Sequence, residues 1–137
     1  MISQGLTTSF KQQLFLAIQN FTTDTFKIAL YTANADLGAD TTVYTTTAEI
    51  TGTGYTAGGL VLTGTTVSVS GTTAFVDFAD AVWNPANFLC RGALIYNSSK
   101  SNAAVAVLDF GGDKVPTTTF TVQMPANTST SALIRLP

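Results

Sequence analysis

The sequence predicts a mainly β protein: an antiparallel β-sandwich or jelly-roll-like barrel of about eight strands, with one N-terminal α-helix packed against it. Two observations support this fold class. Short apolar segments with period-two alternation recur along most of the chain, and turn-forming residues separate them. Helical periodicity is confined to one segment near the start. At 137 residues the chain fits a single domain, residues 1–137.

The predicted helix spans about residues 9–21. Ser9 and Gln12 fit a capping box, in which each side chain bonds to the other residue's backbone N–H. Phe15 and Leu16 fall outside the apolar stripe, so the helix is apolar around more of its circumference than a surface helix needs. Either it is wedged deeply against a sheet, which we prefer, or it also contacts a partner subunit. The apolar stripe consists of Phe10, Leu14, Ala17, Ile18 and Phe21.

The segment Phe26–Tyr31 is the first predicted strand, because its alternation is typical of a strand with one face in a core. A long Thr-, Asp- and Gly-rich segment, Ala33–Gly59, follows it. The glycines of this segment do not form a phosphate loop, because no Lys follows them and the next residues are the β-type Leu60–Leu62. We expect them to permit positive φ at tight bends or bulges. They are Gly52, Gly54, Gly58 and Gly59.

The second half of the chain has an all-β pattern. Val67–Val69 and Phe75–Phe78 predict a hairpin, and Ala81–Trp83 is expected to prolong its second arm after a bend. Phe88–Tyr96 and Ala103–Phe110 are almost continuously apolar, which indicates central strands covered on both faces. The remaining predictions are a short edge strand at 43–47, a turn at 111–116 and two last strands at 120–124 and 132–136.

The composition argues against several classes of partner. Hydrophobic residues make up 45% of the chain and charged residues only 10%, against about 25% charged in an average soluble domain. The net charge is −2 and the six basic residues are scattered, so we expect neither nucleic acid nor anionic lipid as a partner. The sequence lacks a signal-peptide pattern and an apolar stretch of about 20 residues. We therefore expect a soluble protein made in the cytoplasm.

The inventory of reactive side chains is small. The chain has no histidine, which removes the commonest general base and metal ligand. Its one cysteine, Cys90, cannot form an intrachain disulfide, and we expect a buried thiol that packs as a small hydrophobe. A structural zinc site needs four Cys or His ligands and is excluded. We predict no enzyme activity, no cofactor and no resident metal.

The carboxylates do not suggest a site either. Asp77 and Asp80 are neighbours in sequence, as are Asp109 and Asp113, but a glycosidase needs two carboxylates facing each other across about 5–10 Å of a cleft. A loop-bound Ca²⁺ stays open as an alternative, although the EF-hand pattern is missing. We expect the loop aspartates to cap turns instead. These are Asp36, Asp40, Asp109 and Asp113.

Five segments together resemble a family of small virion structural proteins of tailed bacteriophages, and the likeness covers nearly the whole chain. Its most distinctive part is the Phe-Lys-Ile-Ala-Leu-Tyr strand followed by Gly-Tyr-Thr-Ala-Gly-Gly. The resemblance carries no catalytic or ligand residues. The segments are Thr8–Lys11, Thr25–Thr32, Glu49 with Gly54–Gly59, Asp77–Trp83 and Arg91–Ile95.

The resemblance implies a capsid decoration (cement) protein on the exterior of the virion, made in the host cytoplasm. Its partners would be the major capsid protein and further copies of itself, a trimer being one form. The interface residues that we predict are Phe15, Leu16, Leu37, Tyr44 and Tyr55. The alternatives are a neck or tail component, a pilin-like subunit, and a carbohydrate-binding module with Trp83, Tyr44 or Tyr55 as its aromatic platform.

Overall fold

The computed structural model describes the whole chain, residues 1–137, and contains ten strands and one short helix. Every strand pairs antiparallel with its neighbour in a sheet. The predicted fold class is therefore confirmed in its sandwich form. The elements are β1 (Gly5–Leu6), α1 (Thr8–Phe15), β2 (Phe26–Tyr31), β3 (Leu60–Val61), β4 (Thr66–Ser70), β5 (Thr73–Asp77), β6 (Ala81–Trp83), β7 (Cys90–Asn97), β8 (Ala103–Lys114), β9 (Phe120–Val122) and β10 (Ile134–Leu136).

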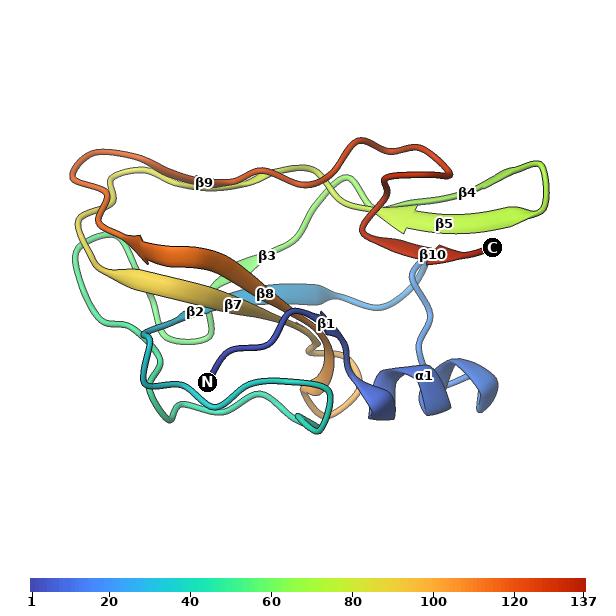
Figure 1. Cartoon of the computed structure of the whole chain (residues 1–137), viewed down its shortest axis with the longest axis horizontal. Helices are drawn as coiled ribbons and strands as arrows, with labels where there is room; N and C mark the ends of the chain where they lie inside the picture. Colours follow the sequence, from blue (N-terminus) through green and yellow to red (C-terminus); the bar gives the residue numbers. More distant parts are fainter.

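The strands form three sheets. The largest has the order β1-β8-β7-β2-β3, and the two smaller sheets are β10-β5-β4 and β6-β9. Figure 1 shows β9 running above β7 and β8, with β4, β5 and β10 beside it in the same upper layer. The main core lies between the two layers, where side chains of both meet. It includes Phe26, Ile28, Leu30, Val76, Trp83, Ile95, Val105, Val122 and Ile134.

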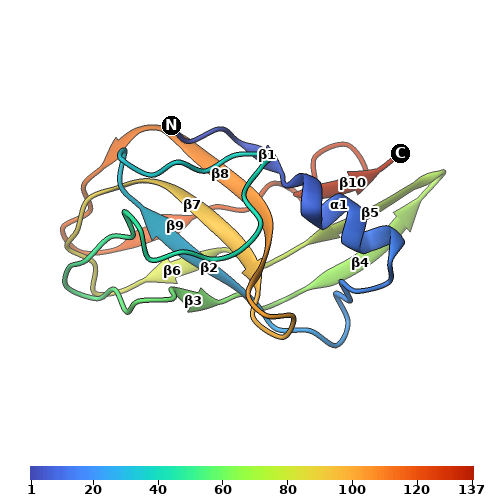
Figure 2. The same ribbon diagram turned by 90° about the horizontal axis from the view of Figure 1, so that it is seen from below.

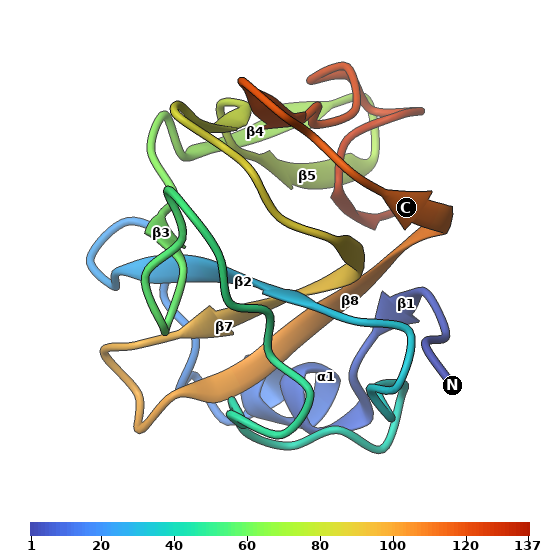
Figure 3. The same cartoon turned by 90° about the vertical axis from the view of Figure 1, so that its left-hand side faces the viewer.

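The central strands are buried on both faces. In β2, Ile28 and Leu30 face the main core, whereas Ala29 and Tyr31 belong to a second core that also includes Leu37. The prediction of one buried face for this strand is therefore wrong, because the segment after β2 folds back across the second face. Figure 3 shows the large sheet between β4–β5 above and the first, teal-coloured part of this segment below. The predicted two-sided burial is confirmed for β7 and for Ala103–Val107 of β8, whereas the part of β8 from Leu108 onward is half-buried or exposed.

The helix begins earlier than the capping-box prediction. Its N-cap is Thr7, whose hydroxyl accepts a hydrogen bond from the N–H of Phe10 at 3.2 Å. The same hydroxyl donates to the carbonyl of Ala104 in β8 at 3.2 Å, so a tertiary contact fixes the cap. The predicted cap at Ser9 is wrong, and its buried hydroxyl has no hydrogen-bond partner.

The helix also ends at Phe15 instead of residue 21. Ala17 has a φ of 58°, and it and Ile18 donate their N–H groups to the carbonyls of Leu14 and Gln13. This is a Schellman-type ending, which normally has glycine in the left-handed position. Because that residue is alanine here, the sequence gives no signal for the stop. Phe21 still reaches the core and stacks on Phe26, with ring centroids 4.5 Å apart.

Ala17→Gly is expected to stabilise the protein by about 0.5–1 kcal/mol. An L-residue in the left-handed region costs about 1–2 kcal/mol, and the extra backbone freedom of glycine in the unfolded chain offsets part of that gain. Chemical denaturation of the two proteins measures the difference. Ala126→Gly is the control, since Ala126 is also exposed but has no positive φ. An Ala17→Gly variant no more stable than the wild type would contradict the left-handed backbone conformation of Ala17.

The predicted hairpin is confirmed as β4 and β5, whose five residue pairs run from Thr66↔Asp77 to Ser70↔Thr73. Its continuation is different, because Ala81–Trp83 forms the separate strand β6 and pairs with β9 in another sheet. The chain changes sheets across the bend at Ala79–Asp80, which sequence alternation alone does not reveal.

Three smaller predictions need correction. The predicted edge strand at 43–47 is only an isolated bridge from Val43 to Ala103. The predicted turn at 111–116 begins later, because β8 continues to Lys114 and pairs with Cys90 across an irregularity in the β7–β8 ladder. The two-residue strand β1, which pairs with β8, was not predicted.

The interpretation of the glycine-rich segment is confirmed. Gly54, Gly58 and Gly59 have φ values of 87°, 95° and 82°. A Cβ on Gly54 would collide with the carbonyl of Pro85, and one on Gly59 with the carbonyl of Ile28. Glycine therefore permits both the left-handed backbone and the close approach of the segment to its neighbours.

Candidate functional site

The single cysteine is part of the core. Cys90 is fully buried, as predicted. Burial raises the pKa of its thiol to about 12, and the nearby charge of Asp113 adds to the effect. The thiol is therefore protonated at neutral pH and unsuited to nucleophilic attack.

The carboxylates are dispersed. No three Cys, Asp or Glu side chains come close enough together to hold a metal ion. Asp77 is buried, and burial is the main cause that raises its pKa; one of its oxygens accepts from the N–H of Phe78 and the other has no partner. Asp80 accepts from the N–H of Met124 at 2.7 Å. Asp109 accepts from the N–H of Gly111 at 2.9 Å, but both residues lie within β8, so this bond is not the turn cap expected for Asp109.

The five predicted interface residues do not gather on one surface. Phe15 and Leu16, at the end of α1, are 92% and 59% exposed. Leu37 is only 2% exposed and packs in the second core, so it offers no surface to a partner. Tyr44 and Tyr55 are half-buried and bond to Glu49 within the chain. Only the helix end therefore remains of the predicted set.

The same two exposed residues correct our preferred interpretation of the helix. Phe10 is the only buried residue of α1, so the helix is not wedged deeply against a sheet. It lies at one end of the molecule, the end that also carries β4, β5 and β10 (Figures 1 and 2). The alternative, a contact between Phe15–Leu16 and a partner, fits this position.

Glu49 organises the long segment between β2 and β3. One of its carboxylate oxygens accepts from the hydroxyl of Tyr44 at 2.6 Å. The other accepts from the hydroxyl of Tyr55 at 2.5 Å and from the N–H of Gly58 at 2.8 Å. Tyr96 of β7 donates to the carbonyl of Gly58 at 2.6 Å, which ties the segment to the sheet. We call these five residues the Glu49 clasp.

The hydroxyl groups of the clasp tyrosines are all engaged. Tyr55 also accepts from the N–H of Leu30 at 3.1 Å, and Tyr44 stacks on Tyr96 with ring centroids 4.7 Å apart. Burial is the main cause that raises the pKa of each of these tyrosines, and the negative charge of Glu49 raises it further; for Tyr96 the value is about 12. The clasp holds backbone and side chains of this chain in place.

The raised tyrosine pKa values predict a loss of stability in alkali. The unfolded chain releases its tyrosine protons near pH 10, whereas the folded protein holds them to higher pH. The contribution of these tyrosines to the free energy of unfolding is therefore constant below pH 10. It falls as the pH rises toward 12 and beyond. We expect tyrosinate absorbance to appear together with unfolding measured by circular dichroism. Titration of these tyrosines near pH 10 in a still-folded protein would contradict the burial of their hydroxyls.

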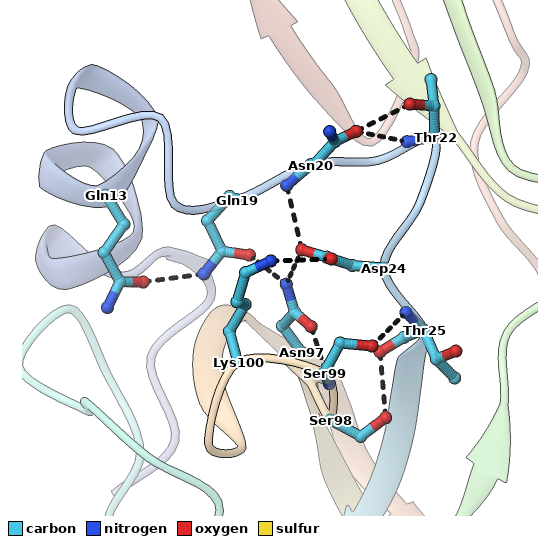
Figure 4. A network of polar contacts seen from close by, with 10 residues as sticks. All are labelled: Gln13, Gln19, Asn20, Thr22, Asp24, Thr25, Asn97, Ser98, Ser99 and Lys100. Atoms are coloured by element: carbon cyan, nitrogen blue, oxygen red, sulfur yellow. Dashed lines mark hydrogen bonds and ion pairs between the residues drawn. The ribbon is translucent and has the colours of Figure 1, made fainter.

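A second polar network fixes the chain between α1 and β2, as Figure 4 shows. Asp24 bonds to Lys100 at 2.9 Å and to the side-chain amide of Asn97 at 2.8 Å. Asn97 is fully buried and also donates to Gln19. Burial alone would raise the pKa of Asp24, but the hydrogen bonds from Asn97, Lys100 and the Asn20 N–H, with the Lys100 charge, lower it overall. The network holds the segment that follows α1 against the turn after β7.

Several exposed apolar residues belong to α1 and to the small three-stranded sheet, which lie at the same end of the molecule (Figure 1). Phe15 and Leu16 project from the end of the helix. Val67 and Val69 are 55% and 73% exposed on β4, and Leu136 is exposed on β10. We call these five residues the apolar end. Adjacent exposed apolar side chains, such as Phe15 with Leu16, are candidates for contact with other molecules.

A groove of about 440 Å³ lies elsewhere, between β8, β9 and the segment before β10. The aromatic residues proposed as a sugar platform are not in it. Trp83 is buried, and Tyr44 and Tyr55 are engaged in the clasp. The residues that line the groove include Gln4, Leu108, Asp109, Phe110, Lys114, Phe120 and Leu133.

No protein-family model matches this sequence, and neither a curated protein nor a solved structure does. The one helix of the fold also lacks the length and apolarity needed to cross a membrane.

Proposed function

We propose that this chain is a non-enzymatic virion structural protein of a tailed bacteriophage, a decoration protein that binds the outer surface of the capsid. The observation that carries the proposal is the exposure of two neighbouring apolar residues at the helix end, Phe15 at 92% and Leu16 at 59%. A large aromatic and a leucine side chain are the kind of anchor that fills a pocket on a partner. The partner is the major capsid protein.

Many of the residues that carry the family resemblance belong to the structural framework of the fold. Phe26–Tyr31 is the central strand β2, and Glu49 with Gly54–Gly59 forms most of the clasp. Arg91–Ile95 lies in β7, the partner of β2. These residues hold the fold together and leave the outer surfaces free to suit one particular capsid.

The mechanism is adhesion. Each copy buries the helix end in the shell and covers part of a seam between capsomers. A single contact of this size is weak, but a shell offers the same site many times, and copies that also contact each other gain avidity. Because charged residues are few, binding is expected to depend little on salt.

Addition of the purified protein to purified expanded capsids of the phage that encodes it tests the proposal. We expect the protein to sediment with the capsids and to raise their rupture temperature. Phe15→Ser with Leu16→Ser should abolish both effects while leaving the fold intact. Val115→Ser is the matched control, since Val115 is 62% exposed and follows the end of β8 at the opposite end of the molecule (Figure 1). An equal loss of capsid binding in the Val115→Ser control, or no binding by the wild type, would refute the proposal.

A further inference from the structure

Strand β4 is an unprotected sheet edge. It pairs with β5 on one side and is the outermost strand of the order β10-β5-β4 on the other. Edge strands commonly carry Lys, Pro or a bulge that prevents pairing with another chain. β4 has the sequence Thr-Val-Ser-Val-Ser and pairs with β5 without an irregularity. Its outer hydrogen-bonding groups are therefore available to a further strand.

One face of this sheet is apolar and only half covered. Val67, Val76 and Ile134 lie in one row across the three strands, and the latter two are buried in the main core. Val69 and Leu136 lie on either side of Ala74 in the next row, which extends beyond the core and is exposed. Figure 1 shows the β4–β5 hairpin extending past the body of the molecule. A strand added to the edge of β4 would widen this face.

The charge distribution favours a second copy of the same chain as the added strand. In a twofold pair the residues near the axis meet their own counterparts, so a charge near the axis would face a like charge. No charged residue occurs between Glu49 and Asp77 in the sequence, and β4 lies within this uncharged segment. The edge is thus electrostatically compatible with itself.

The residue pattern of β4 is symmetric about its centre. Ser70 and Thr73 flank a two-residue turn and form the hydrogen-bonded pair next to it. Because hydrogen-bonded and non-hydrogen-bonded pairs alternate along the hairpin, the N–H and C=O groups of Val67 and Val69 point away from β5, to the free edge. In an antiparallel pair centred on Ser68, Val67 of one copy lies opposite Val69 of the other. Both copies then exchange backbone hydrogen bonds through their valines, and the valine side chains share one face.

We propose that β4 pairs antiparallel with β4 of a second copy about a twofold axis at Ser68, which joins two three-stranded sheets into one of six strands. Five residues per copy are far fewer than the roughly 20–30 per side of a standard interface. The free pair is therefore weak and depends on concentration, and it strengthens wherever copies are held side by side. This inference does not depend on the capsid role.

Disulfide trapping tests both the pairing and its register. The pair at the axis, Ser68 of one copy and Ser68 of the other, is of the non-hydrogen-bonded type. Its expected Cα separation, about 4.5 Å, suits a disulfide. We expect Ser68→Cys to form a dimer under mild oxidation, with a yield about tenfold above that of Thr72→Cys, an exposed control at the hairpin tip. Cys90 is buried and does not interfere.

A mixed experiment fixes the register. Thr66 of one copy faces Ser70 of the other, so Thr66→Cys and Ser70→Cys should each cross-link poorly alone and efficiently when mixed. Thermal unfolding of each variant confirms that it is folded. Equal cross-linking of Ser68→Cys and Thr72→Cys, preferential cross-linking of Thr66→Cys to itself, or large aggregates in place of dimers would each overturn the proposal.

Discussion

Gly59→Ala is expected to prevent folding or to destabilise the protein by at least about 3 kcal/mol. Gly59 has a φ of 82°, which alanine adopts only with strain, and its Cβ would collide with the backbone of Ile28 and Ala29 in the central strand β2. The colliding atoms are backbone atoms of a strand paired on both sides, so they cannot move without breaking the sheet. Expression yield and chemical denaturation measure the effect.

Two glycines provide controls. Gly71 also has a positive φ, 59°, but a Cβ there meets nothing within 4 Å. Gly71→Ala should therefore cost only the backbone strain, about 1 kcal/mol. Gly112 has neither a positive φ nor a close neighbour, and Gly112→Ala should be almost neutral. A Gly59→Ala protein as stable as Gly71→Ala would show that the segment before β3 does not pack against β2 as described.

Glu49→Ala is expected to lower the free energy of unfolding by about 3 kcal/mol. The substitution removes the acceptor of three hydrogen bonds and leaves the Gly58 N–H and the O–H of the half-buried Tyr55 without an acceptor, although the Tyr55 oxygen still accepts from Leu30. Each buried donor left unpaired costs about 1–3 kcal/mol. Urea denaturation measures the total, and limited proteolysis of the segment between β2 and β3 should show that the loss begins there.

Two variants separate the contributions of the clasp. Glu49→Gln keeps one oxygen acceptor and should cost less than Glu49→Ala. Tyr44→Phe removes a single hydroxyl, which donates to Glu49, and should cost about 1 kcal/mol. If Glu49→Ala costs no more than Tyr44→Phe, the carboxylate does not organise this segment.

Sequence periodicity predicted the elements whose neighbours are close in the chain or whose burial is uniform. The hairpin β4–β5 needs only local information, and the apolar runs of β7 and β8 are independent of the partners that cover them. The alternation in Phe26–Tyr31 suggested one buried face, because Ala29 and Tyr31 look suitable for a surface. Only the fold reveals that the following segment covers them.

The errors share a physical cause, which is tertiary contact. Thr7 caps the helix because β8 holds it, and Ala17 ends the helix without the glycine that normally marks such a stop. Glu49 was part of the noted resemblance, but its role depends on Tyr55 and Gly58 converging on it across a bend. Among the predicted interface residues, Phe15 and Leu16 stood out because they broke the apolar stripe, and these are the two that the structure exposes.

The copy number of the protein in purified virions tests the central claim most directly. Quantitative mass spectrometry of the particle, with the major capsid protein as the internal reference, gives the ratio of the two chains. A decoration protein that binds the seams between capsomers predicts a ratio set by the number of capsomers, with the protein accessible to protease on intact particles. A number that fits only one ring of a neck or tail, or absence of the protein from the virion, would contradict the account.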